Sequence, residues 1–208
     1  INIKTLPENH FYLGPIIWSP EIKTKNYNLK QKNNVYISMG SSGNNDLLPY
    51  IIDSALKNNL NIILSGVNSM EKENLIKSIP NLKYRSIIEP LINAEEILPF
   101  CRLTICHGGS GTVYQSIANG IPVLCFPKNP DQGLISMAVA QNNIGRFLTK
   151  KTVNKISIDE LINECASNDV ISQNVKNMQL EIAQWNTKKR WLQFLSKFKT
   201  IRKIKTTI

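Results

Sequence analysis

The stretch that decides the fold is CHGGSGT, Cys106 to Thr112, which follows the apolar run LTIC (103–106) and precedes TVYQSIANG (112–120). A short apolar run, a glycine-rich loop and a segment of helical periodicity are typical of a strand, a turn and a helix. The loop surrounds one of only two histidines in the chain. Backbone N–H groups at the start of a helix can face an anion, and small residues let that anion approach closely. This stretch therefore predicts an anion-binding loop at the carboxyl end of a strand.

The same alternation of strand and helix runs outward from this loop. Apolar, β-branched runs at 35–40, 60–66, 84–91 and 121–127 predict strands, and the segments 46–59, 70–79, 92–100 and 131–145 have helical periodicity. Continuous apolar strands that alternate with helices predict an α/β fold, a Rossmann-like parallel sheet with helices on both faces. In such sheets ligands bind beyond the carboxyl ends of the strands, where GSSG (40–43) and HGGSGT fall. We expect Asp131 to cap the helix 131–145 and Gly145 to end it.

The chain divides into three parts. Residues 1–20 are an extended, proline-containing connector, residues 21–184 form the α/β domain, and residues 185–208 form a basic amphipathic helix and tail. Its apolar face carries Trp191, Phe194, Leu195 and Phe198. The connector and the initial Ile1 suggest a piece of a longer chain.

Composition indicates an ordinary globular domain, with 42% hydrophobic and 19% charged residues among 208. There is no apolar run of about 18 residues and no secretory pattern at the start, so we expect a cytoplasmic location. The four cysteines, at 101, 106, 125 and 165, form no C-x-x-C pair, which predicts reduced structural thiols.

The net charge of +10 belongs to the tail, because eight of the 25 basic residues and no acidic residue follow Trp185. The rest of the chain holds 17 basic against 15 acidic residues and is nearly neutral. Nucleic-acid binding thus rests on the tail alone. A solvated basic end is the simplest interpretation, and peripheral contact with the inner membrane face is the alternative.

Several motif templates do not fit the loop. There is no G-x-x-x-x-G-K-[ST] P-loop, and Tyr114 stands where a dinucleotide fingerprint needs its third glycine. No histidine follows Ser110, which excludes a serine hydrolase of the nucleophile-elbow type. The spacing of a zinc site is not found among Cys101, Cys106 and His107. The sequence also has no D-x-D carboxylate pair, so we expect the anion to be bound without a metal ion.

The segment HGGSGTVYQSIANGIPVLCFPKNPDQ (107–132) resembles the donor-binding signature of family 1 glycosyltransferases, the UDP-glycosyltransferases. FYLGPI (11–16), VYISMGSSG (35–43) and ILPFCRLTICHGG (97–109) extend the resemblance over about residues 11–198. It implies a GT-B fold of two Rossmann-like lobes, of which this chain is the C-terminal, donor-binding lobe.

The resemblance also implies roles for particular residues. The donor diphosphate would be held by Ser41, Ser42, His107, Gly109, Ser110, Gly111 and Thr112. Asp131 and Gln132 would bind the sugar, and Gln115 stands where a glutamate commonly contacts the ribose. The loop 88–98 would flank the nucleobase, with Leu91 and Ile92 where an aromatic residue is common. No metal and no other cofactor is implied, and the general base is expected in an N-terminal lobe outside this chain.

These observations favour the UDP-sugar-binding lobe of an inverting, metal-independent glycosyltransferase that transfers a hexose. The alternative is a non-catalytic donor-binding subunit that needs a separate acceptor-binding partner chain, as in the two-subunit N-acetylglucosaminyltransferase of dolichol-linked oligosaccharide synthesis. A nucleotide-sugar epimerase shares the fold, but its catalytic carboxylates are not found in the sequence.

Overall fold

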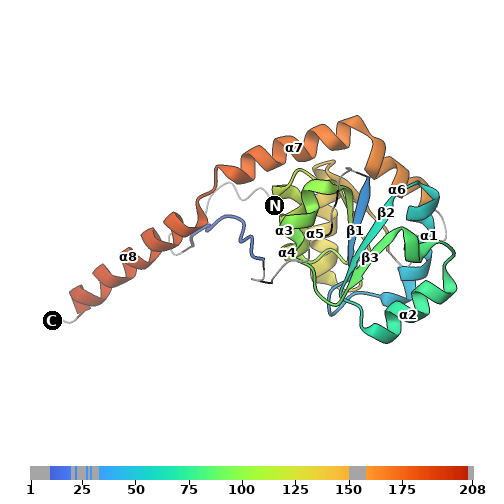
Figure 1. The fold of residues 1–208 in the computed structure, drawn as a ribbon. Coiled ribbons are helices and arrows are strands. Elements are labelled where there is room, and N and C mark those ends of the chain that lie inside the picture. The colour runs from blue at the N-terminus through green and yellow to red at the C-terminus, as the bar shows by residue number, and fades with distance from the viewer. Residues whose placement is uncertain are drawn as a thin grey trace.

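The computed structural model describes residues 10–19, 22, 27, 29, 33–149 and 158–205, with side chains up to 196. Six parallel strands form one sheet in the order β3-β2-β1-β4-β5-β6 (Figure 1). The strands are β1 (Asn34–Ser38), β2 (Asn61–Ser65), β3 (Ser86–Glu89), β4 (Cys101–Cys106), β5 (Val123–Cys125) and β6 (Gly145–Phe147). The predicted α/β class with a parallel, Rossmann-like sheet is confirmed.

Helices follow the strands and cover both faces of the sheet. They are α1 (Leu48–Lys57), α2 (Ser69–Ser78), α3 (Ala94–Ile97), α4 (Ser110–Ala118), α5 (Pro130–Gln141), α6 (Ile158–Ser167), α7 (Asp169–Ala183) and α8 (Thr187–Lys205). Three short 3₁₀ turns, η1 (Asn45–Leu47), η2 (Leu82–Tyr84) and η3 (Leu98–Phe100), complete the connections.

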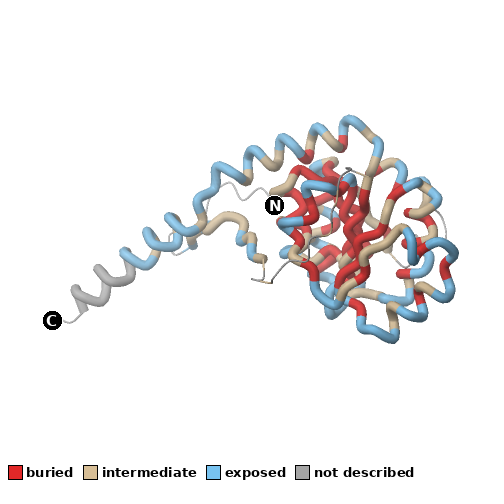
Figure 2. Tube along the Cα trace, viewed as in Figure 1, coloured by how far each residue is buried: buried red, intermediate tan, exposed pale blue. Residues whose placement is uncertain are grey.

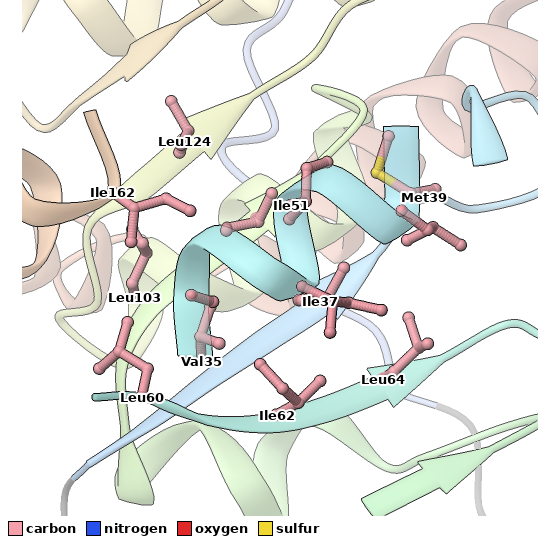
Figure 3. Close-up of a cluster of buried hydrophobic side chains, with 14 of the residues drawn as sticks. Val35, Ile37, Met39, Ile51, Leu60, Ile62, Leu64, Leu103, Leu124 and Ile162 are labelled. Carbon is pink, nitrogen blue, oxygen red and sulfur yellow. The ribbon is translucent and has the colours of Figure 1, made fainter. Parts of the chain in front are cut away.

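One face of the sheet packs against α1, α2 and α6. Alternate strand residues such as Val35, Ile37 and Leu103 point to this face and are fully buried (Figure 3). Helix α1 meets them with Ile51 and neighbouring apolar residues three or four positions apart, the spacing that places side chains on one helical face. The other face is covered by α3, α4, α5 and α7, and the buried residues of the whole lobe gather around the sheet (Figure 2).

The boundaries of α5 differ from those that the sequence predicts. The N-cap is Asn129, whose Oδ1 accepts from the backbone N–H of Gln132 at 2.9 Å, and Asp131 lies exposed one residue inside the helix. Pro130 at the first helical position has the φ that a helix start requires, so the earlier asparagine, and not Asp131, is the cap. The helix ends at Gln141, and Asn143, at φ +49°, turns the chain.

Gly145 is correspondingly not a helix terminator but the first residue of β6. A Cβ at this position would overlap the carbonyl oxygen of Val123 on β5, so only glycine allows the two strands to pair here. Strand β6 has three residues and was missed because so short a run carries no periodicity.

Helix α8 extends away from the body of the lobe, and residues 10–19 of the connector lie beside its start (Figure 1). Arg190 donates from Nε and Nη2 to the carbonyl oxygen of Tyr12, at 2.8 and 2.6 Å. Its guanidinium also covers the rings of Phe11 and Trp185, at 5.1 and 4.7 Å from their centroids. We call this set of contacts, Phe11 and Tyr12 with Trp185 and Arg190, the clamp. Among the described helices, none is long and apolar enough to cross a membrane.

Candidate functional site

The predicted loops meet at the point where the strand order of the sheet reverses. The chain runs from β1 outward to β3, then returns to β4 beside β1 and continues outward to β6. Ser38 on β1 pairs with Cys106 on β4, so the loops that begin at Met39 and at His107 leave the sheet side by side. This reversal is where open α/β sheets bind ligands.

His107 is wedged between two glycines that its ring requires. A Cβ on Gly40 would lie 2.6 Å from Cε1 of the imidazole, and a Cβ on Gly109 would lie 2.5 Å from Nε2. Atoms cannot approach so closely, so both positions must lack a side chain for the ring to lie there. Gly40 also has a φ of +59°, which favours glycine. The role of Gly40 was not predicted, because it depends on the pairing of β1 with β4.

The environment of His107 favours the neutral form of the imidazole. Burial lowers its pKa below 6.5, and the backbone of Ser38 only partly opposes that shift. Nδ1 is buried and has no partner with hydrogen-bond geometry among the described residues, so the Ser38 carbonyl lies near the ring without forming a proper hydrogen bond. Nε2 lies on the side of Gly109, toward the start of α4. A neutral imidazole still carries one N–H donor.

Helix α4 begins without a side-chain cap. Its N-cap is Gly109, whereas α2, α3, α5 and α7 each begin after an asparagine whose side chain accepts from a backbone N–H of the first turn. The N–H groups of Ser110, Gly111 and Thr112 therefore keep their capacity to donate at the positive end of the helix dipole. This start of α4 lies at the carboxyl end of β4, next to His107.

The glycines of this loop fall into two groups. Gly108, at φ +84°, lies so close to Ser136 on α5 that a Cβ would come within 2.5 Å of Oγ, and Gly109 is required by His107. Gly111 differs, since a Cβ there would meet no atom within 4 Å. Packing within the described structure does not explain glycine at position 111.

Ser42 and Gln132 join the loop after β1 to the start of α5. The side chain of Gln132 is 3% exposed, donates from Nε2 to Ser42 Oγ at 2.9 Å and accepts from the backbone N–H of Lys128 at 2.8 Å. Its amide thus fixes the relative position of the two loops. Ser41 and Asp131 are exposed beside this contact.

The nucleobase-loop residues differ in exposure. Leu91 is exposed, whereas Ile92 is buried against α3 and its neighbours, and its backbone N–H donates to Ser65 Oγ at 3.2 Å. Of the two side chains, only that of Leu91 faces outward from the loop.

Gln115 lies on the buried side of α4 and contacts the connector. Nε2 donates to the carbonyl oxygen of Trp18 at 2.7 Å and to Ser19 Oγ at 3.0 Å. Neither connector residue was predicted to be near the site. No pattern in the sequence predicts this contact, because Gln115 lies 97 positions from Trp18 and 96 positions from Ser19.

Beneath the loop lie two thiols on adjacent strands. Cys106 and Cys125 are register partners of β4 and β5, both fully buried and free. The hydrogen bond between the thiols raises the pKa of Cys125, and burial adds to that shift. All four cysteines are buried, and none of them forms a disulfide. In the part of the chain that the structure describes, no group of three or more His, Cys, Asp or Glu side chains is arranged to hold a metal ion.

Two cavities lie away from the loop edge. One of about 210 Å³ lies near the start of β4 and the junction of α6 with α7, and one of about 270 Å³ lies between α1 and α2. Neither is lined by a predicted site residue. The geometry of the loops at the reversal point, and not cavity size, identifies the candidate site.

Comparison with known proteins agrees with this geometry. Residues 51–188 match the family model described as the erythromycin biosynthesis protein CIII-like C-terminal domain. The PGL/p-HBAD biosynthesis glycosyltransferase of Mycobacterium tuberculosis is 27% identical over 165 residues, which are 78% of this chain and 37% of that protein. The matched region is therefore well under half of this relative.

Solved structures show the same fold. The spinosyn forosaminyltransferase SpnP superimposes with a TM-score of 0.73 at 16% identity, over 88% of this chain and 48% of that one. Os79 from O. sativa, in complex with UDP, superimposes with a TM-score of 0.64 at 19% identity, over 81% of this chain and 41% of that one. Together with the family match, these likenesses show that the chain belongs to the erythromycin biosynthesis protein CIII-like C-terminal domain family and is a C-terminal lobe of the family 1, GT-B glycosyltransferases.

Proposed function

We propose that this lobe binds the nucleotide-sugar donor, a UDP-sugar, of an inverting glycosyltransferase that transfers a hexose. The observation that carries the proposal is the start of α4, where three uncapped N–H groups, the open face of Gly111 and the imidazole of His107 lie together at the reversal point of the sheet. The UDP complex of the structurally similar Os79 supports uridine as the nucleoside.

The residues of this lobe would act mainly on the leaving group. When a glycosyl group departs from a nucleotide sugar, negative charge develops on the diphosphate. The N–H groups of Ser110, Gly111 and Thr112 and the N-terminal end of the α4 dipole would stabilise that charge without further reorganisation. The hydroxyls of Ser110 and Thr112 and the His107 N–H would add donors. We propose that this set is sufficient without a metal ion.

Ser41 and Ser42 would approach the diphosphate from the opposite loop, and Asp131 and Gln132 would meet the sugar hydroxyls. The contact between Gln132 and Ser42 supports a common position for the two loops, since one amide joins them. Asp131, which is exposed next to Gln132, has both carboxylate oxygens available to accept from sugar hydroxyls.

The acceptor and the general base would belong to an N-terminal lobe or to a separate partner chain. Exposed aromatic residues support such a partner, since Trp18 is 70% and Trp191 45% exposed on the connector and α8. Membrane contact through the basic residues of α8 stays a prediction from charge, and a cytoplasmic location stays a prediction from the lack of a secretory pattern in the sequence. We expect the 208-residue chain to bind the donor but to transfer little sugar in a radiolabelled transfer assay.

Calorimetry and thermal unfolding test the proposed donor. Among UDP, TDP, GDP and their sugars, UDP and UDP-sugars should raise the unfolding temperature most, because a ligand of the folded state stabilises it by mass action. The His107→Ala variant should weaken UDP binding by about 1.5–3 kcal/mol, the range of hydrogen bonds to charged groups.

The other histidine is the matched control. His10 is exposed and lies in the connector, so His10→Ala should leave UDP affinity unchanged. Equal affinity of the wild type and His107→Ala would remove the histidine from the site. No stabilisation by any nucleotide, with EDTA or with added divalent cation, would refute the proposed function.

A further inference from the structure

The connector reaches the edge of the candidate site through one buried amide. Gln115 is 9% exposed, and its Nε2 uses both hydrogens on the connector, one for the Trp18 carbonyl oxygen and one for Ser19 Oγ. A glutamate here would have no hydrogen to donate and would place a carboxylate against the Trp18 carbonyl. Glutamine at this position is therefore explained by the connector.

The position of Gln115 on α4 places this contact beside the open loop. Gly111 and Thr112 precede it by four and three residues, the spacing that puts side chains on one face of a helix. Helical side chains also lean toward the N-terminus, so the Gln115 amide extends toward the turn of Gly111. The connector residues that it holds consequently lie on the side of α4 where Gly111 faces open space.

Two hydrogen-bonding capacities remain unused at this contact. Within the described residues, Oε1 of Gln115 accepts no hydrogen bond, and it is not among the fully buried polar atoms. Ser19 Oγ accepts from Gln115, and its own hydrogen has no acceptor in the described part of the chain. An acceptor and a donor therefore lie next to each other.

Such a pair is complementary to a vicinal diol. Each hydroxyl of a ribose can both donate and accept, so one can donate to Oε1 while its neighbour accepts from Ser19. We propose that Ser19 of the connector is a ribose-binding residue, which Gln115 holds in position while offering Oε1 to the second hydroxyl. This inference rests on the proposed function, because it names the group that recognises the ribose of the bound nucleotide.

Calorimetry with UDP and 2′-deoxy-UDP tests the inference. The wild type should bind UDP more tightly than 2′-deoxy-UDP. Ser19→Ala should lower the affinity for UDP about fivefold, the effect of one neutral hydrogen bond, and should change that for 2′-deoxy-UDP less than twofold. Gln115→Leu should reduce the preference for UDP in the same way, because it removes Oε1 and releases Ser19.

Ser167→Ala is the matched control, since Ser167 is exposed at the end of α6 and should leave both affinities unchanged. Thermal unfolding of each variant without nucleotide shows that the lobe is folded. A wild type without preference for the 2′-hydroxyl, or a Ser19→Ala variant that keeps the preference, would overturn this inference alone. Failure of the wild type to bind UDP at all would instead refute the proposed function.

Discussion

Helices α4 and α5 both begin at the candidate site, and they begin in opposite ways. The first turn of α5 is capped by Asn129, starts with Pro130 and buries Gln132 in contacts with the protein. The first turn of α4 has a glycine cap, three free N–H groups and an open face at Gly111. The chain itself satisfies the start of α5, whereas the start of α4 leaves its donors available. Under the proposed function, the diphosphate would bind at the first turn of α4, while the first turn of α5 joins the two loops through Gln132 and offers the Asp131 carboxylate to the sugar.

The largest change in stability is expected from adding a methyl group at Gly109, the N-cap of α4. Gly109→Ala should lower stability by about 1–3 kcal/mol, because its Cβ would overlap the wedged His107 ring. The unfolding temperature should fall by about 2–4 °C for each kcal/mol. The double variant with His107→Ala should recover most of the lost stability, since the ring is then gone. Additive losses of stability in the double variant would contradict the close packing of the His107 ring against Gly109.

Loss of the N-cap of α5 should lower the free energy of unfolding by an intermediate amount. Asn129→Ala removes the hydrogen bond to the Gln132 N–H and should cost about 1 kcal/mol, measured by urea unfolding. UDP affinity should change little, because the cap belongs to the protein and not to the ligand. Asn74→Ala, on the exposed side of α2, is the control for a general loss of asparagine, because the Asn74 side chain makes no hydrogen bond to the described residues. A tenfold loss of UDP affinity in Asn129→Ala would show that α5 is not independent of the nucleotide.

The smallest change in stability is expected at Gly111, where we also expect the largest difference between the effect on stability and the effect on UDP affinity. Gly111→Ala should stabilise the lobe by about 0.5 kcal/mol, because alanine loses less backbone entropy and its methyl group meets nothing in the protein. UDP binding should nevertheless weaken at least tenfold by calorimetry, since the methyl group would fill the path of the diphosphate.

Gly133→Ala on α5 is the matched control, because a Cβ there also meets no atom within 4 Å. It should show the same gain in stability with less than a threefold loss of UDP affinity. An unchanged affinity in Gly111→Ala would mean that the diphosphate does not approach α4.

Local patterns in the sequence predicted the sheet and the helices, because strands buried on both faces are continuous apolar runs. The loop at 106–112 was predicted for the same reason, since its glycines directly follow such a run. Details that depend on packing were not accessible. The room that Gly40 leaves for His107, the short strand β6 and the contact of Gln115 with Trp18 arise between segments far apart in the chain.

The cap of α5 was misassigned for a different reason. Both Asn129 and Asp131 are good capping residues, and Pro130 between them decides the choice through its restricted φ. The preference of proline for the first helical turn was available in the sequence and would have identified Asn129.

The clamp has a mechanical consequence. Arg190 holds the Tyr12 carbonyl with two N–H groups while Gly14 lies directly against the Trp185 ring and Thr187 donates to the Pro15 carbonyl at 2.9 Å. The connector is thus attached to α8 at one end and to α4, through Gln115, at the other. Displacement of α8 would pull on the same connector that contacts Gln115, so a rearrangement far from the candidate site would be transmitted to its edge without any change in the sheet.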